Sequence, residues 1–289
     1  MIFIVLFICI LNLVASELIN VDYAAVPSNI EGIDQLDDAG YTALMLAAMV
    51  GKVEHVKNYI KAGANVNLTT TDGQSALMLS ARNGFYYTSI ELIKSGSNLD
   101  QTNRYGMTPL LLAIAGGYVE IVGAMLDGGA NPDIGAADGA TALMMAAQKG
   151  QDKIVQQLIK NNANINLRTA TGETALMFAA SVGHMNSTRV LLEAGANTND
   201  VNNMGHTSIM LAAARGHSAV VELLIDHKAD MNIRDELGRT ALDHAISESN
   251  QGVIDVLVGC GAVMPRSGFR VSAEIMNKRR SMIADSERH

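Results

Sequence analysis

Glycine, hydroxyl and aliphatic residues recur along this chain with a fixed period of 33 residues. The glycines that set the register are Gly40, Gly73, Gly106, Gly139, Gly172, Gly205 and Gly238. A Thr or Ser follows each glycine by two residues and a Leu or Ile by four, and pairs of Ala come next in four units. Because only 26 of 289 residues are glycine, the chance of this spacing is roughly one in a million. The pattern indicates a repeat array, and each hydroxyl is a natural N-cap for a first helix.

A second helix is predicted in each unit, after a second glycine. This turn glycine lies eleven residues after the first, at Gly51, Gly84, Gly117, Gly150, Gly183 and Gly216, with Ser249 in the last unit. Apolar residues then follow at helical spacing, as in residues 154–159. A glycine that can adopt the left-handed conformation ends most of these helices, and Asn162 and Lys228 take that position in two units. A loop rich in Asn and Asp, such as residues 164–166, completes the unit.

The unit resembles the ankyrin repeat, a 33-residue unit with a Thr-Pro-Leu-His-type motif and a Gly-Ala-Asp-Val-Asn-type ending. The motif reads Thr-Ala-Leu-Met at residues 42–45, 141–144 and 174–177, and the ending reads Gly-Ala-Asn-Val-Asn at 63–67. The resemblance implies an all-α, ankyrin-type helix-turn-helix solenoid with β-hairpin-like loops between repeats. The seven repeats that we assign are 37–69, 70–102, 103–135, 136–168, 169–201, 202–234 and 235–265. Residues 17–36 are expected to form an N-terminal cap, and no linker or second domain is found.

Two departures from the family motif bear on its chemistry. Pro is kept only at Pro109, and the motif His is replaced by Met in five repeats, by Leu111 in the third and by Asp243 in the last. We therefore expect each first helix to rely on its N-cap hydroxyl alone. The methionines are Met45, Met78, Met144, Met177 and Met210. They could form a soft metal site or an apolar groove, but their place in the structural motif favours packing.

No pattern typical of catalysis is found in the sequence. There is no nucleophile elbow, phosphate loop or repeated carboxylate pair, and no Cys/His spacing resembles a metal site. His184 and His217 follow the turn glycines, where the family commonly carries His, so we interpret both as structural. His206 and His227 lie in one repeat but on opposite sides of it. We expect no enzyme activity, no catalytic residue, no metal and no cofactor.

Composition and charge narrow the classes of partner. With 48% hydrophobic residues the chain can bury a sizeable core, and its two cysteines exclude a disulfide framework. The net charge of −8 argues against binding to nucleic acid or to an anionic membrane surface. Residues 266–289 depart from this balance, because they carry six Lys or Arg against three Asp or Glu. We interpret them as a basic C-terminal tail or end cap, with a basic anchor as the alternative.

The N-terminal residues resemble a secretory signal. Residues 2–14 are almost all apolar, and Val14-Ala15-Ser16 places small residues where a signal peptidase cleaves. We assign a signal peptide to residues 1–16, although Lys and Arg are missing before the apolar run. The run is shorter than the roughly 20 residues that cross a bilayer. We expect an exported protein with no membrane span after cleavage; the alternative is a cytosolic protein whose N-terminal segment is buried or serves as an anchor.

The resemblance implies a concave binding surface, made of the loop tips around each register glycine and the ends of the first helices. The candidate partner-binding residues are Tyr41, Met49, Arg82, Asn83, Arg104, Tyr105, Met107, Gln148, Lys149, His206, Arg215 and Arg239. Arg104 and Tyr105 are the strongest candidates for an anchor, since Arg and Tyr are enriched in binding hot spots. In the second repeat, residues 86–89 replace the usual aliphatic face of the second helix, either by repacking or as a further site.

Three functional hypotheses remain from the sequence. The leading one is a monomeric, non-catalytic interaction module that is exported and binds another protein through its concave face. A second is a cytosolic or membrane-anchored scaffold or host-directed effector with the same fold. A third is a regulatory subunit of an enzyme in the same compartment.

Overall fold

The computed structural model describes residues 32–263, which form pairs of short α-helices joined by loops. The predicted signal peptide, residues 17–31 of the predicted cap, and the basic tail lie outside the described residues. The chain divides into two compact units, the first ending at Asn131 and the second starting at Pro132.

Each unit is a stack of helix pairs. In the first unit the first helices are α2 (Ala43–Met49), α4 (Ala76–Arg82) and α6 (Pro109–Gly116), and the second helices are α3 (Val53–Lys61), α5 (Tyr86–Lys94) and α7 (Val119–Asp127). In the second unit the first helices are α8 (Ala142–Gln148), α10 (Ala175–Val182), α12 (Ser208–Ala214) and α14 (Ala241–Ser247). Their partners are α9 (Asp152–Lys160), α11 (Met185–Glu193), α13 (Ser218–Asp226) and α15 (Gln251–Gly259).

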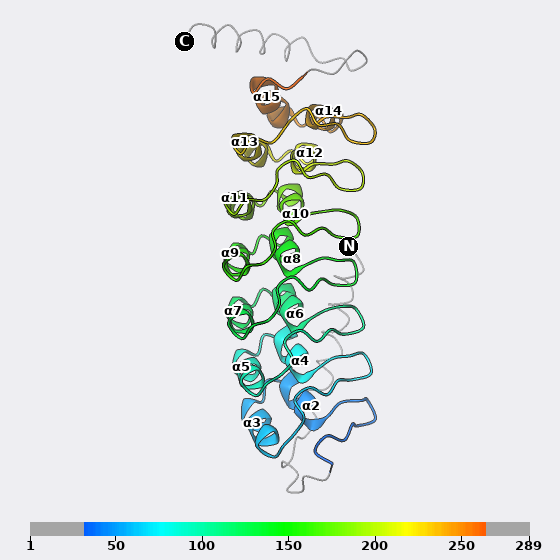
Figure 1. Cartoon of the computed structure of the whole chain (residues 1–289), viewed down its shortest axis with the longest axis vertical. Helices are drawn as coiled ribbons and strands as arrows, with labels where there is room; N and C mark the ends of the chain where they lie inside the picture. The colour runs from blue at the N-terminus through cyan, green and yellow to red at the C-terminus, as the bar shows by residue number, and fades with distance from the viewer. Residues whose placement is uncertain (1–31, 264–289) are drawn as a thin grey trace. The chain divides into compact units, whose positions relative to one another are not determined.

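Within each unit, like helices lie side by side. First helices pack on neighbouring first helices, second helices on neighbouring second helices, and the two helices of a pair on each other. The loops that connect successive pairs lie beside the first helices (Figure 1). The described residues contain no β-strand, only an isolated bridge between Thr69 and Ser75. The predicted all-α, helix-turn-helix fold class is confirmed.

The core explains the methionines of the repeat motif. Met45, Met78, Met144, Met177 and Met210 are at most 2% exposed. They fill space between stacked helices and offer no surface to a metal or a partner, so the packing interpretation is confirmed.

Each first helix starts at the predicted hydroxyl. In six repeats the Thr or Ser oxygen accepts the backbone N–H three residues further on, at 3.2–3.4 Å. The hydrogen bond satisfies one of the N–H groups that a helix N-terminus leaves without an intrahelical acceptor.

The expectation that this hydroxyl acts alone is wrong in three repeats. The sulfur of Met45 accepts the N–H of Thr42 at 3.5 Å, and the sulfur of Met144 accepts that of Thr141 at 3.4 Å. In the last repeat the carboxylate of Asp243 accepts the equivalent N–H at 2.8 Å. The residue that replaces the family His therefore supplies the second half of a capping box.

Asn and Asp side chains join successive repeats within each unit. Seven of these side chains accept a backbone N–H from the residue 31 positions further on, beginning with Asp34, which accepts from Asn65 at 2.9 Å. Asn67 makes the same bond to Asn98 at 2.7 Å, so residues 33–34 lie in register with 66–67 as predicted. This ladder explains why the loops are rich in Asn and Asp.

The left-handed positions are also where the sequence places them. Asn162, Lys228 and Ser249 are the non-glycine residues with positive φ among the described residues, at 61°, 64° and 57°. The other repeats carry glycine at these places, because an L-residue is strained in this conformation and glycine is not.

The irregular second helix of the second repeat is accommodated by repacking. Ser89 is fully buried, and its hydroxyl lies 2.9 Å from the hydroxyl of Ser80. Tyr86 and Tyr87 are 41% and 76% exposed and stack edge to face on each other. The buried polar pair thus replaces the aliphatic contact of most other repeats; the fifth repeat also carries a polar residue, Thr188, at the position of Ser89.

No helix in the described part of the chain combines the length and apolar character that a bilayer crossing requires.

Candidate functional site: the loop tips

The loop tips are built on one repeated hydrogen bond. Each tip is a segment of five residues, and the seven tips are 37–41, 70–74, 103–107, 136–140, 169–173, 202–206 and 235–239. In all seven, the first residue donates its backbone N–H to the carbonyl of the fifth, at 2.9–3.1 Å. In the tips that start with Asp37, Asn103, Asn202 or Asp235, a side-chain oxygen of that residue also accepts two backbone N–H groups of the tip. This bonding fixes the tip before any partner is bound.

The predicted anchor pair lies on one such tip. The backbone N–H of Arg104 donates to the carbonyl of Asp72 on the preceding tip at 3.0 Å, and its guanidinium forms an ion pair with the Asp72 carboxylate at 2.6 Å. The guanidinium also donates to the Tyr105 hydroxyl and lies 4.7 Å from the centre of that ring. The hydrogen bond to Tyr105 raises the pKa of the Arg104 guanidinium. We call these three residues the Arg104 tip.

The Arg104 tip is exposed and ordered by its own contacts. The side chain of Arg104 is 54% exposed and that of Asp72 is 44% exposed, while Tyr105 is half-buried. A planar cation and an aromatic ring are therefore presented to solvent in a fixed arrangement.

The other predicted surface residues differ in how much they offer to a partner. Lys149 and Arg215 are exposed, whereas Tyr41, Arg82, Met107, Gln148, His206 and Arg239 are half-buried. Burial lowers the pKa of the Arg82 guanidinium, at the end of α4. These residues stay predictions, because their exposure alone does not show a binding role.

Two of the predicted positions have structural roles. Met49 is only 5% exposed, so the expectation that it lines a binding surface is wrong for this residue. The amide of Asn83 donates to the carbonyl of Met49 at 2.9 Å and joins the ends of α2 and α4. The first-helix end of these two repeats is therefore held together and leaves less side-chain surface than predicted.

The turn histidines are structural, as predicted. The His184 ring nitrogen Nε2 lies 3.1 Å from the carbonyl of Gln148, and that of His217 lies 3.3 Å from the carbonyl of Ser181. Each ring connects its repeat to the first-helix end of the preceding repeat.

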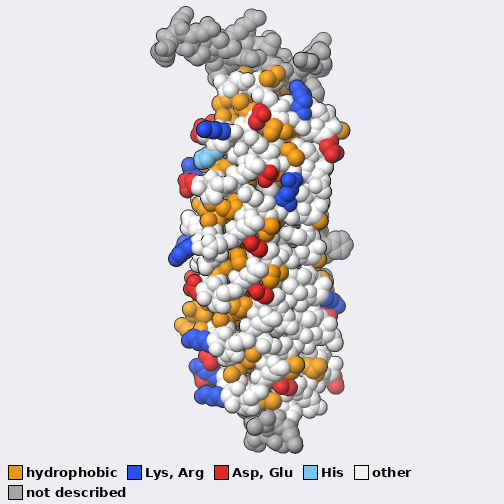
Figure 2. Space-filling view, viewed as in Figure 1, with side chains coloured by type: hydrophobic (Ala, Val, Ile, Leu, Met, Phe, Trp, Pro, Cys, Tyr) orange, Lys and Arg blue, Asp and Glu red, His pale blue; other side chains and the backbone are white. Residues whose placement is uncertain are grey.

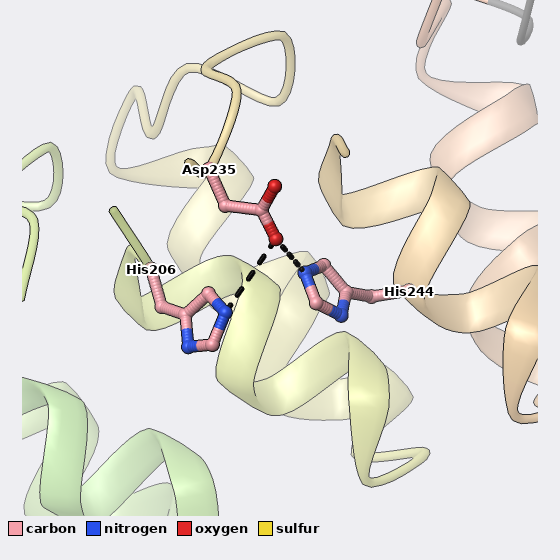
Figure 3. Close-up of side chains that lie close together, drawn as sticks. All are labelled: His206, Asp235 and His244. Atoms are coloured by element: carbon pink, nitrogen blue, oxygen red, sulfur yellow. Dashed lines mark hydrogen bonds and ion pairs between the residues drawn. The ribbon is translucent and has the colours of Figure 1, made fainter. Parts of the chain in front are cut away.

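A further group of side chains meets at the tips of the last two repeats. His206 on one tip, Asp235 on the next and His244 on α14 face one another (Figure 3). The Asp235 oxygen Oδ2 lies 3.0 Å from Nε2 of His244 and 3.5 Å from Nε2 of His206. The two imidazole rings are perpendicular, with centres 5.2 Å apart. We call these three residues the His206 cluster.

The His206 cluster is much less accessible than the Arg104 tip. The side chains of His206, Asp235 and His244 are 15%, 1% and 9% exposed. Arg239 also donates from Nε to the Asp235 oxygen Oδ2 at 2.9 Å.

Opposing effects act on the titration of this cluster. Burial favours a higher pKa for Asp235, but hydrogen bonds from the backbone and guanidinium of Arg239 and from His244 outweigh it and lower that pKa. Burial lowers the pKa of His244 against the opposing effect of its bond to Asp235. The lowered pKa of His244 favours its neutral form, and the lowered pKa of Asp235 favours its charged form.

Charges of both signs are mixed on the described part of the surface that faces the viewer in Figure 2. On the face shown in Figure 2, Lys and Arg side chains are interspersed with Asp and Glu within each unit. A surface of mixed charge suits a protein partner better than a polyanion.

The family of the chain is decided by a comparison with family models. A model of ankyrin repeats, in three copies, matches residues 11–103, 44–135, 86–169, 124–202, 143–235 and 195–266. The chain belongs to the ankyrin repeat family. Ankyrin repeats are a general protein–protein interaction module, and no enzyme family is indicated.

Solved ankyrin structures resemble the chain in fold. The ankyrin repeat domain of human ASB11 aligns with a TM-score of 0.67 and 25% identity, over 78% of this chain and 100% of that domain. The ankyrin repeat domain of Bcl-3, a member of the IkappaB family, aligns with a TM-score of 0.68 and 25% identity, over 76% and 99% of the two chains. No curated protein matches the sequence.

The His206 cluster was not recognised in the sequence. Its members are separated by 29 and 9 residues, which is unlike the short spacings of a metal motif. A signal was nevertheless present within the ankyrin register. The position of His244 carries an apolar residue in the six other repeats, namely Leu46, Leu79, Leu112, Met145, Phe178 and Leu211.

Proposed function

We propose that this ankyrin repeat chain is a non-catalytic module that binds a partner protein through its loop tips and first-helix ends. The observation that supports this most directly is the Arg104 tip. It presents a cation and an aromatic ring at the surface, fixed by Asp72 and by the tip backbone. A side chain that is already ordered loses less conformational entropy on binding than a free one, and Arg and Tyr are the residues most often found in hot spots.

The proposed partner is a polar peptide or the edge of a folded protein. In the first unit the acidic Asp72 pairs with Arg104, and the end of α4 adds Arg82. In the second unit the first-helix ends add Lys149 and Arg215, and the tips add acidic residues such as Glu173. Each unit thus carries both signs of charge, which favours recognition of a mixed-charge protein surface over a nucleic acid.

The test is a comparison of captured partners between variants. We expect the double variant Arg104→Ala/Tyr105→Ala to recover at least about tenfold less of the true partner than the parent chain. The matched control is Tyr87→Ala/Arg189→Ala, which removes the same two residue types from exposed positions on the second helices α5 and α11. The proposed surface would be contradicted if both double variants lost the same amount of captured partner, or if neither lost any.

We further propose that the protein is exported, on the basis of the apolar residues 2–14 and the small residues that follow them. A tag at the C-terminus and an intact-mass measurement from the native cell test this. A mature chain that starts at or near Glu17 is expected. An intact Met1 on a cytosolic protein would overturn export and leave the partner-binding proposal standing.

A further inference from the structure

The His206 cluster brings three potential metal-ligand atoms together from two successive repeats. One ligand atom from each of His206, Asp235 and His244 lies within 4.8 Å of the others. The carboxylate oxygen Oδ2 stands between the two imidazoles, and both rings turn Nε2 toward it (Figure 3).

The spacing of these atoms matches a coordination sphere. Ligands bound to Zn²⁺ at about 2.0–2.2 Å in tetrahedral geometry lie roughly 3.4 Å apart. The two measured separations, 3.0 Å and 3.5 Å, lie on either side of that value. The third separation, between the ligand atoms of the two histidines, is within 4.8 Å.

The donor set indicates which ion is preferred. Two imidazole nitrogens and one carboxylate oxygen suit Zn²⁺ and neighbouring transition metals, whereas Mg²⁺ and Ca²⁺ prefer oxygen alone. Three protein ligands leave a fourth position, and the 15% exposure of the His206 side chain gives solvent access to it.

Comparison with the other repeats shows that the ankyrin fold does not require these histidines. The position of His206 carries Tyr41, Gln74, Met107, Ala140, Glu173 or Arg239 in the other repeats. The position of His244 is always apolar elsewhere, yet here a buried ring points its nitrogen at a buried carboxylate. Replacing an apolar residue by a buried imidazole adds a polar group that needs a partner, so packing alone does not account for it.

The immediate surroundings are suited to an ion, with one competitor. Asp235 holds its tip through Oδ1, which accepts the N–H groups of Leu237 and Arg239 at 2.9 Å and 2.8 Å, so the tip does not depend on Oδ2. The guanidinium of Arg239, 40% exposed, competes for Oδ2 and can swing into solvent.

We propose that His206, Asp235 and His244 form a binding site for one Zn²⁺ ion that connects the last two ankyrin repeats. The ion would be held by Nε2 of each histidine and by Oδ2 of the aspartate, with a water or an external ligand in the fourth position. Since the site is assembled only when both repeats are folded and stacked, zinc would stabilise this end of the second unit.

The test is a zinc titration of the full chain, without a polyhistidine tag and stripped with a chelator. Isothermal titration calorimetry is expected to show one equivalent of Zn²⁺ with a Kd on the order of 1 μM. Saturating zinc should raise the Tm by about 5 °C. Cobalt bound in place of zinc should show the visible absorption of a four-coordinate ion.

The variants use residues that the other repeats already accept, so that folding is preserved. His244→Leu restores the residue of Leu112, and His206→Gln restores that of Gln74. Each is expected to weaken zinc binding at least about tenfold and to reduce the Tm shift at the same zinc concentration. His55→Gln, which removes a histidine from α3 in the first unit, is the matched control and should bind like the parent.

Two results would overturn the proposal. The first is no binding by the stripped parent chain, and the second is unchanged affinity in the double variant His206→Gln/His244→Leu. Arg239→Gln gives an independent check, because loss of the competing cation should tighten binding by about threefold or more. An unchanged Kd in this variant would place zinc away from Oδ2.

Discussion

The loop tips of the third and seventh repeats are built on the same backbone hydrogen bond but differ in their side chains. The third tip exposes Arg104, whereas the seventh buries Asp235. At the three positions that form the His206 cluster in the last two repeats, the second and third repeats carry Gln74, Asn103 and Leu112. Asn103 Oδ1 accepts two tip N–H groups at 2.9 Å and 3.0 Å, and Asp235 Oδ1 accepts the equivalent two at 2.9 Å and 2.8 Å. One oxygen is thus sufficient to build the tip.

The two tips differ at the other terminal atom of that side chain, which is Nδ2 in Asn103 and Oδ2 in Asp235. Oδ2 of Asp235 forms hydrogen bonds with His244 and Arg239, and the carboxylate is buried. In the third repeat the cationic side chain is instead Arg104, which turns outward to Asp72 and Tyr105. The same tip backbone thus carries a buried polar cluster in one repeat and an exposed cation beside an aromatic ring in the other.

The largest expected effect is that of removing the carboxylate itself. Asp235→Ala should lower the free energy of unfolding by about 3 kcal/mol, because two backbone N–H groups, a buried imidazole and a guanidinium lose their acceptor. Asn103→Ala should cost about 1–2 kcal/mol, since it affects only the two tip N–H groups. Urea unfolding followed by circular dichroism measures both. Equal losses would mean that the buried charge adds nothing to the tip.

A smaller effect is expected from making the seventh tip resemble the third. Asp235→Asn keeps the oxygen that accepts the tip N–H groups, as Asn103 does, but removes the negative charge. We expect a loss of about 1–2 kcal/mol, from the weakened bonds to His244 and Arg239, with the fold intact. The same urea titration measures it, and a loss as large as that of Asp235→Ala would show that the charge, rather than the shape, builds the tip.

The features that recur along the chain could be predicted from the sequence, whereas the contacts of individual side chains could not. Period, N-cap hydroxyls and left-handed positions such as Lys228 follow from rules that act within about four residues, and the structure confirms them. The sulfur bond of Met45 was missed because Met is ordinarily treated as an apolar residue and its thioether sulfur is only a weak acceptor. His206 was predicted as a partner-binding residue because it lies on a loop tip, and its contact with Asp235 and His244 joins residues 29 and 38 positions apart, beyond the reach of rules that act within a few residues.

A transfer of the cluster would sharpen the comparison further. The triple variant Gln74→His/Asn103→Asp/Leu112→His places the ligands of the seventh tip on the third. The Gln74 oxygen is buried without a hydrogen-bond partner, so little is lost by replacing it. We expect zinc titration to rise from one equivalent to two, and the single variant Gln74→His to remain at one. If the triple variant binds only one equivalent, zinc binding at Asp235 depends on neighbouring residues other than His206 and His244.

The smallest effect on stability is expected at the Arg104 tip. The ion pair between Arg104 and Asp72 is about half exposed on both sides, and such pairs contribute little because water screens them and the side chains lose entropy. Arg104→Ala should therefore leave the Tm unchanged within about 1 °C by scanning calorimetry, while it weakens the proposed partner contact. A fall of several degrees would make Arg104 part of the structure of the tip, and its exposed guanidinium would no longer argue for a binding role.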